Sequence, residues 1–161
     1  MKPFRILLLA ALAVSLSGGA RKPQLAVHFH VESVGAAGGH FTVPAKFVNP
    51  PREGHIEAVP FASERNIAAI FPVENADGTI GCAFKLDQSG KFALETLSKD
   101  RRGASIFITM ATKTGHHQVI DMVIDKPILD GIIFVPKGIT PGELTMLQQL
   151  YPIMGQPKKK K

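Results

Sequence analysis

An Asp-Gly turn between two apolar segments is the feature that most restricts how this chain can fold. Residues 67–73 and 79–86 are rich in β-branched and aromatic residues, and Asp77 and Gly78 stand between them. Glycine readily takes the positive φ that a tight hairpin turn needs. The pattern predicts an antiparallel pair of strands, with which every other element has to be compatible.

Other strands are predicted from alternation and from short apolar runs. Apolar and polar residues alternate from Leu25 to Val34, as in a strand with one buried face. Residues 41–47 follow the glycine-rich segment as a second strand, and Pro44 favours an edge or bulge position there. Further short strands are expected at residues 55–59, 105–110, 118–124 and 131–135.

Two helices have recognisable start signals. Asp87 can cap a helix over residues 88–98, whose apolar residues gather on one side. The second helix has Thr140 as its cap, Pro141 at the first helical position and Glu143 three residues after the cap. This spacing is typical of a capping box. Both helices are therefore expected to cover a sheet.

These elements predict the α+β class: a mostly antiparallel sheet with two amphipathic helices on one face, ferredoxin-like or related, preceded by an N-terminal hairpin. The loop sequence of residues 49–54 suggests a soft boundary near residue 52. We expect four parts, namely a signal peptide (1–20), N-terminal strands and loop (21–52), an α+β domain (53–155) and a disordered lysine-rich tail (156–161).

The first twenty residues have the order of a secretory signal peptide. Lys2 and Arg5 precede the uncharged apolar run of residues 6–16, and small residues follow up to Ala20. As a helix, this run would reach about 16 Å, roughly half of a hydrocarbon core. An exported protein, periplasmic or extracellular, is predicted. If the leader is not cleaved, the alternative is a membrane-tethered envelope protein.

The basic net charge comes from the two ends of the chain. Of the formal charge of +6, Lys2, Arg5 and the four terminal lysines account for all six units. The remaining body is neutral, which argues against nucleic-acid binding, because that function needs a basic surface. Weak contact with an anionic membrane is an alternative role for the tail lysines, Lys158, Lys159, Lys160 and Lys161.

Three segments of the second half resemble one protein family. Residues 84–92 (FKLDQSGKF), 126–131 (KPILDG) and 138–144 (GITPGEL) keep the order and spacing of turn and cap motifs. The chain resembles the SecD family of protein-export components over about residues 63–150, in the head of their first periplasmic domain. The resemblance implies the head fold and a polypeptide-contacting role.

Two differences from the family pattern limit what this resemblance implies about activity. Residues 111–123 lack the Asp-Gly turn and the Ser-Ala-Pro of the family pattern, and no counterpart of the family's transmembrane helices is recognised. Proton-coupled translocation depends on that membrane portion. The translocase activity is therefore not expected here.

Cys82 and the histidine pair at residues 28 and 30 are the candidates for metal or redox chemistry. Cys82 lies on the apolar side of a predicted strand, so a buried core thiol is favoured over a reactive nucleophile. His28 and His30 share a strand face and could chelate a metal, but no third ligand is placed by the sequence. We expect exposed strand histidines, with no metal and no cofactor.

No catalytic motif stands out. His116 and His117 are expected in a turn, and Asp121, Asp125 and Asp130 suit turn and cap roles better than acid-base catalysis. The common hydrolase, zinc-protease and nucleotide motifs are missing. A non-enzymatic protein is predicted. The alternative is a small secreted hydrolase that uses Asp121, His117 or a neighbouring serine.

The leading hypothesis is an exported accessory or binding module that contacts polypeptide or an envelope partner. Contact is expected through a sheet edge or through a loop at residues 111–117. The candidate contact residues of that loop are Lys113, Thr114, Gly115, His116 and His117.

Overall fold

The computed structural model describes residues 24–33 and 41–156, and the predicted leader and terminal lysines lie outside the described residues. These described residues form nine strands, two α-helices and one 3-10 helix, and all pairs among these strands are antiparallel. The predicted α+β class is confirmed. The elements are β1 (Leu25–Val31), β2 (Thr42–Val48), β3 (Pro51–Glu57), β4 (Ala62–Ser63), η1 (Glu64–Asn66), β5 (Ile67–Glu74), β6 (Ile80–Leu86), α2 (Gln88–Asp100), β7 (Ser105–Thr112), β8 (Gly115–Val123), β9 (Ile132–Ile139) and α3 (Pro141–Leu150).

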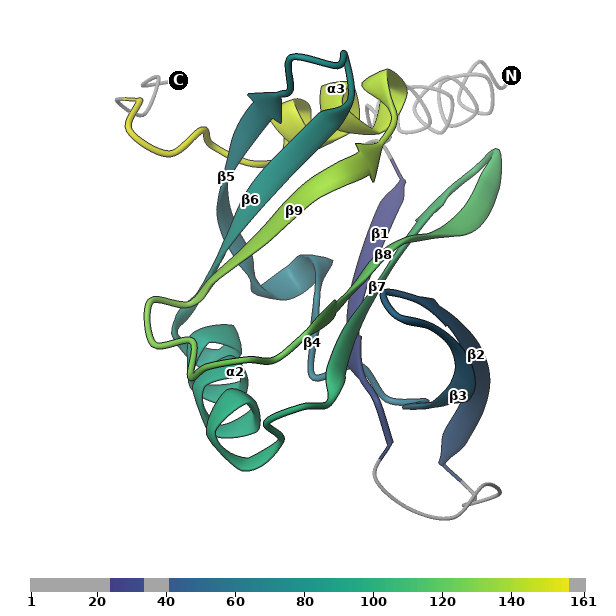
Figure 1. Ribbon diagram of the computed structural model, residues 1–161. Helices are drawn as coiled ribbons and strands as arrows, with labels where there is room; N and C mark the ends of the chain where they lie inside the picture. Colours follow the sequence, from purple (N-terminus) through teal and green to yellow (C-terminus); the bar gives the residue numbers. More distant parts are fainter. Residues whose placement is uncertain (1–23, 34–40, 157–161) are drawn as a thin grey trace, which may run out of the picture.

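The strands are divided among three sheets, whereas we expected one (Figure 1). The orders are β4-β1-β7-β8, β2-β3 and β5-β6-β9. The two larger sheets share one hydrophobic core, to which both helices contribute, through Leu94 of α2 and Leu144 and Leu147 of α3. The division follows from long-range pairing of β1 with β7, which no local signal in the sequence indicates.

The centre of the core is where β1 faces β6. Val27, Phe29 and Val31 of β1 are withdrawn from solvent, while the residues between them face the other side of the sheet. The ring of Phe29 packs edge-to-face on Phe84 of β6, with 5.7 Å between centroids. Each fully buried side chain of this size contributes about 1.5–3 kcal/mol by leaving water. Apolar burial therefore joins the two larger sheets.

The predicted tight turn at Asp77 and Gly78 is formed. Gly78 has a φ of +79°. A carboxylate oxygen of Asp77 accepts hydrogen bonds from the backbone N–H of Thr79 at 3.0 Å and from its hydroxyl at 2.7 Å. This turn joins β5 to β6, and the register of the pair places Phe71 opposite Ala83.

Both predicted helix caps are confirmed. Asp87 accepts a hydrogen bond from the Gly90 N–H at 2.8 Å at the start of α2. At the start of α3, the Thr140 hydroxyl accepts from the Glu143 N–H at 3.3 Å, and Glu143 accepts from the Thr140 N–H at 2.9 Å. These caps satisfy backbone donors that the helices leave unpaired.

The region around residue 52 differs from the predicted loop. β3 begins at Pro51, so residue 52 lies inside a strand, and β2 and β3 form a hairpin across it. β1 does not join this hairpin, because it pairs with β4 and β7. Pro50 and Pro51 are compatible with this hairpin, because at its turn no ladder donor is lost. The domain boundary stays a prediction.

The hairpin lies on the outer face of the four-stranded sheet (Figure 1). Its apolar contact is small: Phe47 and Ile56 pack on Phe107 of β7, and the two phenylalanine rings are 5.7 Å apart. Polar contacts at two places supplement this cluster.

The first polar contact joins the hairpin turn to β8. Both carboxylate oxygens of Asp121 accept backbone hydrogen bonds, from the Val48 N–H at 2.7 Å and the Asn49 N–H at 2.8 Å. The Gln118 amide donates a third bond at 2.9 Å. Asp121 is only 1% exposed, and these three donors satisfy its buried carboxylate oxygens. Its role is structural.

The second polar contact is an ion pair between β3 and the residue after β1. The Arg52 guanidinium donates two hydrogen bonds to Glu32, and it also lies 4.2 Å from the Phe47 ring centroid. Burial opposes ionisation of Glu32, but the bonds from Arg52 and Ser105 outweigh it and lower the Glu32 pKa. The two polar contacts therefore attach the hairpin at separate points.

Asp121→Asn is expected to lower the free energy of unfolding by about 1–3 kcal/mol, because an amide cannot accept both turn N–H bonds and leaves a buried donor unsatisfied. Urea unfolding followed by circular dichroism measures this. Asp125→Asn, a change at an exposed carboxylate just after β8, is the control and should alter stability by less than about 0.5 kcal/mol. Equal stability of the two variants would contradict the structural role of Asp121.

Candidate functional site

The predicted contact loop is the tip of a hairpin. Ala111 belongs to β7 and His116 to β8, where the two residues are paired, so the turn itself is made by Lys113 and Thr114. The Thr112 and Thr114 hydroxyls are hydrogen-bonded at 2.8 Å. The expectation of turn histidines at 116 and 117 is therefore wrong. The predicted loop at residues 111–117 is thus shorter than expected, because two residues suffice to close this hairpin.

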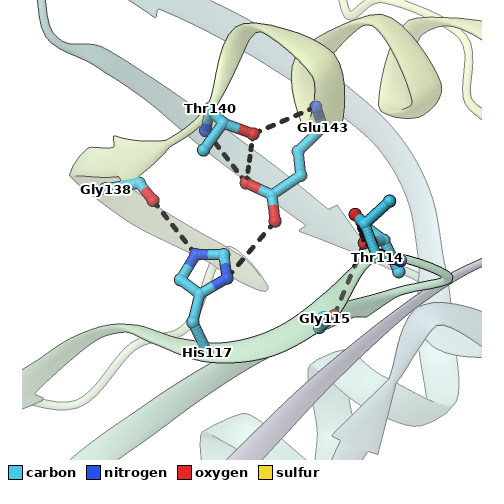
Figure 2. Close-up of polar contacts among 7 residues, drawn as sticks. Thr114, Gly115, His117, Gly138, Thr140 and Glu143 are labelled. Atoms are coloured by element: carbon cyan, nitrogen blue, oxygen red, sulfur yellow. Dashed lines mark hydrogen bonds and ion pairs between the residues drawn. The ribbon is translucent and has the colours of Figure 1, made fainter.

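His117 connects this hairpin to the start of α3. Figure 2 shows its ring between Gly138 and Glu143. Its Nδ1 lies 3.5 Å from a Glu143 carboxylate oxygen, and its Nε2 lies 3.5 Å from the Gly138 carbonyl oxygen. The other Glu143 oxygen accepts from Thr140 in the capping box. The contact thus joins β8 to the capped start of α3, the helix that follows β9 of the neighbouring sheet.

The residues considered for hydrolysis are engaged elsewhere. Asp121 is occupied by the hairpin turn, and the carboxylate near His117 is Glu143, which caps α3. Asp130 accepts a hydrogen bond from the Ile132 N–H at 3.0 Å, which is a turn role. Among the described residues, Asp121 and His117 therefore do not form a carboxylate–imidazole pair.

The two histidines of β1 lie together, as expected from their spacing. The rings of His28 and His30 are 5.9 Å apart and nearly perpendicular. With His116 of β8 they line a cavity of about 360 Å³ between the β2–β3 hairpin and the four-stranded sheet. No group of three histidine, cysteine or acidic residues in the described part of the chain could hold a metal. The sequence did not predict that His116 lines the same cavity as the two β1 histidines.

Cys82 is a core thiol, as predicted. Its side chain is fully buried among the apolar residues of the main core. Burial raises the pKa of the Cys82 thiol to about 11, against the smaller effect of a hydrogen bond with the backbone of Phe71. A thiol with this pKa is almost entirely protonated at neutral pH. The geometry therefore supports no nucleophilic role for Cys82.

An exposed apolar face of the β5-β6-β9 sheet was missed by sequence reasoning. Phe71 and Phe134 are paired with Ala83 from either side, so these three residues form one row across the sheet. Phe71 is 49% exposed and Phe134 is 48% exposed. In Figure 1, α3 lies behind these strands, and no other described element crosses the front. The alternation of residues 132–135 could have revealed this exposed face. It puts Phe134 on one side of the strand and the core residues Ile133 and Val135 on the other.

The two edges of this sheet differ. At the β5 edge, the segment after α3 is bound to Ile70, through its N–H to Pro152 O at 3.0 Å and its C=O to Met154 N at 2.8 Å. At the other edge, the Leu86 N–H bonds the Gly131 carbonyl at 2.9 Å. Since bonding alternates along an antiparallel ladder, the Phe134 N–H and C=O point away from β6. The β9 edge is thus available at Phe134.

No family model matches this chain, and no curated protein matches its sequence. Among solved structures, it is similar to the membrane component SecDF, described as enhancing protein export, with a TM-score of 0.54, 13% identity, and coverage of 96% of this chain and 73% of that chain. It is also similar to SecDF in a super-membrane-facing form, with a TM-score of 0.52, 13% identity, and coverage of 83% of this chain and 20% of that chain.

At 13% identity, these matches establish a shared fold. The resemblance to the SecD family noted in the sequence is confirmed at that level. No helix among residues 24–33 and 41–156 is both long enough and apolar enough to cross a membrane.

Proposed function

We propose that this protein is an exported, non-enzymatic accessory module that binds extended polypeptide at the β5-β6-β9 sheet. The observation that carries the proposal is the row Phe71, Ala83 and Phe134, whose two rings stay half-exposed beside the available β9 edge. Monomeric proteins rarely leave aligned aromatic side chains uncovered without a binding role.

An extended chain suits this surface in two ways. Its backbone can pair with the free N–H and C=O of Phe134, which adds a strand to the sheet. Its alternate side chains then point to the same face as Phe71 and Phe134 and pack on them. Ala83 between the two rings is itself buried, so the apolar contact is made with the rings of Phe71 and Phe134.

The similarity to SecDF supports this reading. One matching structure is of a membrane component that enhances protein export. A polypeptide or an envelope protein as partner is consistent with that description. Since a fold by itself does not specify function, the proposal depends on the exposed face of this chain.

The tip of the β7–β8 hairpin is proposed as a second contact. Lys113, Thr114, Gly115 and His116 are all exposed there. His117 anchors the tip to α3, so the first four residues are presented on a fixed support. A partner that approaches this tip meets a basic and hydrogen-bonding surface.

Export itself is proposed from the leader sequence. If the leader is cleaved after Gly19 or Ala20, the mature protein is released, and if it is retained, the module is tethered to a membrane. The described part of the chain is the same in both cases.

Phe71→Ser combined with Phe134→Ser is expected to weaken polypeptide binding about tenfold or more, since both apolar contacts are lost. Fluorescence anisotropy with a labelled, reduced and alkylated polypeptide measures the affinity. Phe92→Ser is the matched control, because Phe92 is 70% exposed on α2, away from this face. The proposal fails if the double variant binds as tightly as the control.

Lys113→Ser combined with His116→Ser should remove an envelope partner that depends on the hairpin tip. Affinity capture from an envelope extract, with quantitative mass spectrometry of the captured proteins, compares this variant with the unchanged protein. Lys126→Ser removes an exposed positive charge in the β8–β9 connection and serves as control. Identical captured proteins in all three samples would exclude the tip as a contact.

Mass spectrometry of the protein purified from an exporting host is expected to find an N-terminus at Ala20 or Arg21, as cleavage after the small residues requires. Recovery of the intact leader in the membrane fraction would instead support the tethered form. An intact leader on protein confined to the cytoplasm would contradict export.

A further inference from the structure

The cavity below the β2–β3 hairpin has an apolar wall and a basic one. Val43 and Ile56 from the hairpin and Phe107 from β7 supply apolar surface, while His28, His30 and His116 supply imidazoles. Its volume of about 360 Å³ is at the small end of ligand sites. This space lies on the opposite side of β1 from the main core, because the histidines alternate with the buried residues of that strand.

Lys46 of β2 supplies a cation to this lining, beside the three imidazoles. No carboxylate side chain of residues 24–33 and 41–156 lines the cavity. The carboxylates of neighbouring elements are engaged: Glu32 after β1 binds Arg52 of β3, and Glu57 of β3 binds Arg101 at 2.8 Å.

Two acidic neighbours remain: Glu53 of β3, which is paired with Lys46 across the hairpin, and one residue of η1. Glu64 Oε2 lies 3.8 Å from His28 Nε2, outside hydrogen-bond range, and has no hydrogen-bond partner among the described residues. It approaches His28 without lining the cavity. An anion inside the cavity would therefore meet basic groups from β1, β2 and β8.

His30 is placed to respond to such an anion. Its Nδ1 lies 2.9 Å from the Glu57 carbonyl oxygen, which can only accept, so Nδ1 carries the proton. Its second nitrogen, Nε2, is then the one that titrates. Burial lowers the pKa of His30, the bond to Glu57 opposes this, and His28 and His116 lower it further. Without a ligand, the ring is neutral at pH 7.

We infer that this cavity is a binding site for a small amphipathic carboxylate, with an apolar body of about eight carbons against Val43, Ile56 and Phe107 and its head group beside the three imidazoles. A bound carboxylate favours the protonated form of the imidazole next to it, because an anion stabilises the positive charge of the ring. The site is separate from the Phe71 and Phe134 surface, so it does not depend on polypeptide binding.

Octanoate is the probe for this inference, followed by NMR of the histidine ring protons in the full mature chain. Saturable shifts are expected for His28, His30 and His116, whereas His55 and His117, which do not line the cavity, should stay in place. Affinity should rise as the pH falls from 8 to 6, by at most about tenfold for each unit by which bound octanoate raises an imidazole pKa. Octanoate itself stays ionised throughout this range.

Two controls make the result decisive. Octanol has the same apolar body without the charge and should bind at least about tenfold more weakly, with no pH dependence. Lys46→Gln combined with His116→Gln should weaken octanoate binding by a similar factor, whereas Lys126→Gln should leave it unchanged.

The variants concern side chains at or near the surface, and circular dichroism verifies that they fold. Measurement on the unchanged protein is decisive on its own. The inference is overturned if octanoate gives no saturable shift, if the shifts fall on His55 or His117, or if octanol binds equally well.

Discussion

The alternation of side chains along β1 is the constraint on which the rest of the structure depends. One set is buried, and its members Leu25, Val27 and Phe29 belong to the core that joins the two larger sheets. The other set, His28 and His30, faces the β2–β3 hairpin. A shift of one residue in the pairing with β7 would exchange the two sets and bury both imidazoles in the apolar core. Core packing and the basic cavity are thus consequences of one register.

The two attachments of the hairpin show how polar contacts can position an element that has little apolar contact of its own. Asp121 is buried and the Glu32–Arg52 pair is partly buried, and each of the two carboxylates accepts several hydrogen bonds. Buried charges of this kind add less to stability than apolar packing of the same volume, but they require a specific geometry. They therefore determine where the hairpin lies, and with it the size of the cavity below.

Local signals in the sequence predicted local structure well. The turn at Asp77 and Gly78 and the capping box at Thr140 and Glu143 depend on neighbours within four residues, and both are formed. The pairing of β1 with β7 and the division into three sheets depend on contacts between distant segments, so periodicity could not reveal them. For the same reason, the sequence suggested His28 and His30 as a pair but gave no sign that His116 joins them.

The recognition of the hairpin turn by Asp121 is mostly independent of side-chain identity. Its two short bonds come from backbone N–H groups of residues 48 and 49, which any residue except proline can supply. Substitution of either side chain therefore leaves both backbone bonds in place, provided that the new residue is not proline. Since neither residue lines the cavity below the hairpin, such substitutions also leave its lining unchanged.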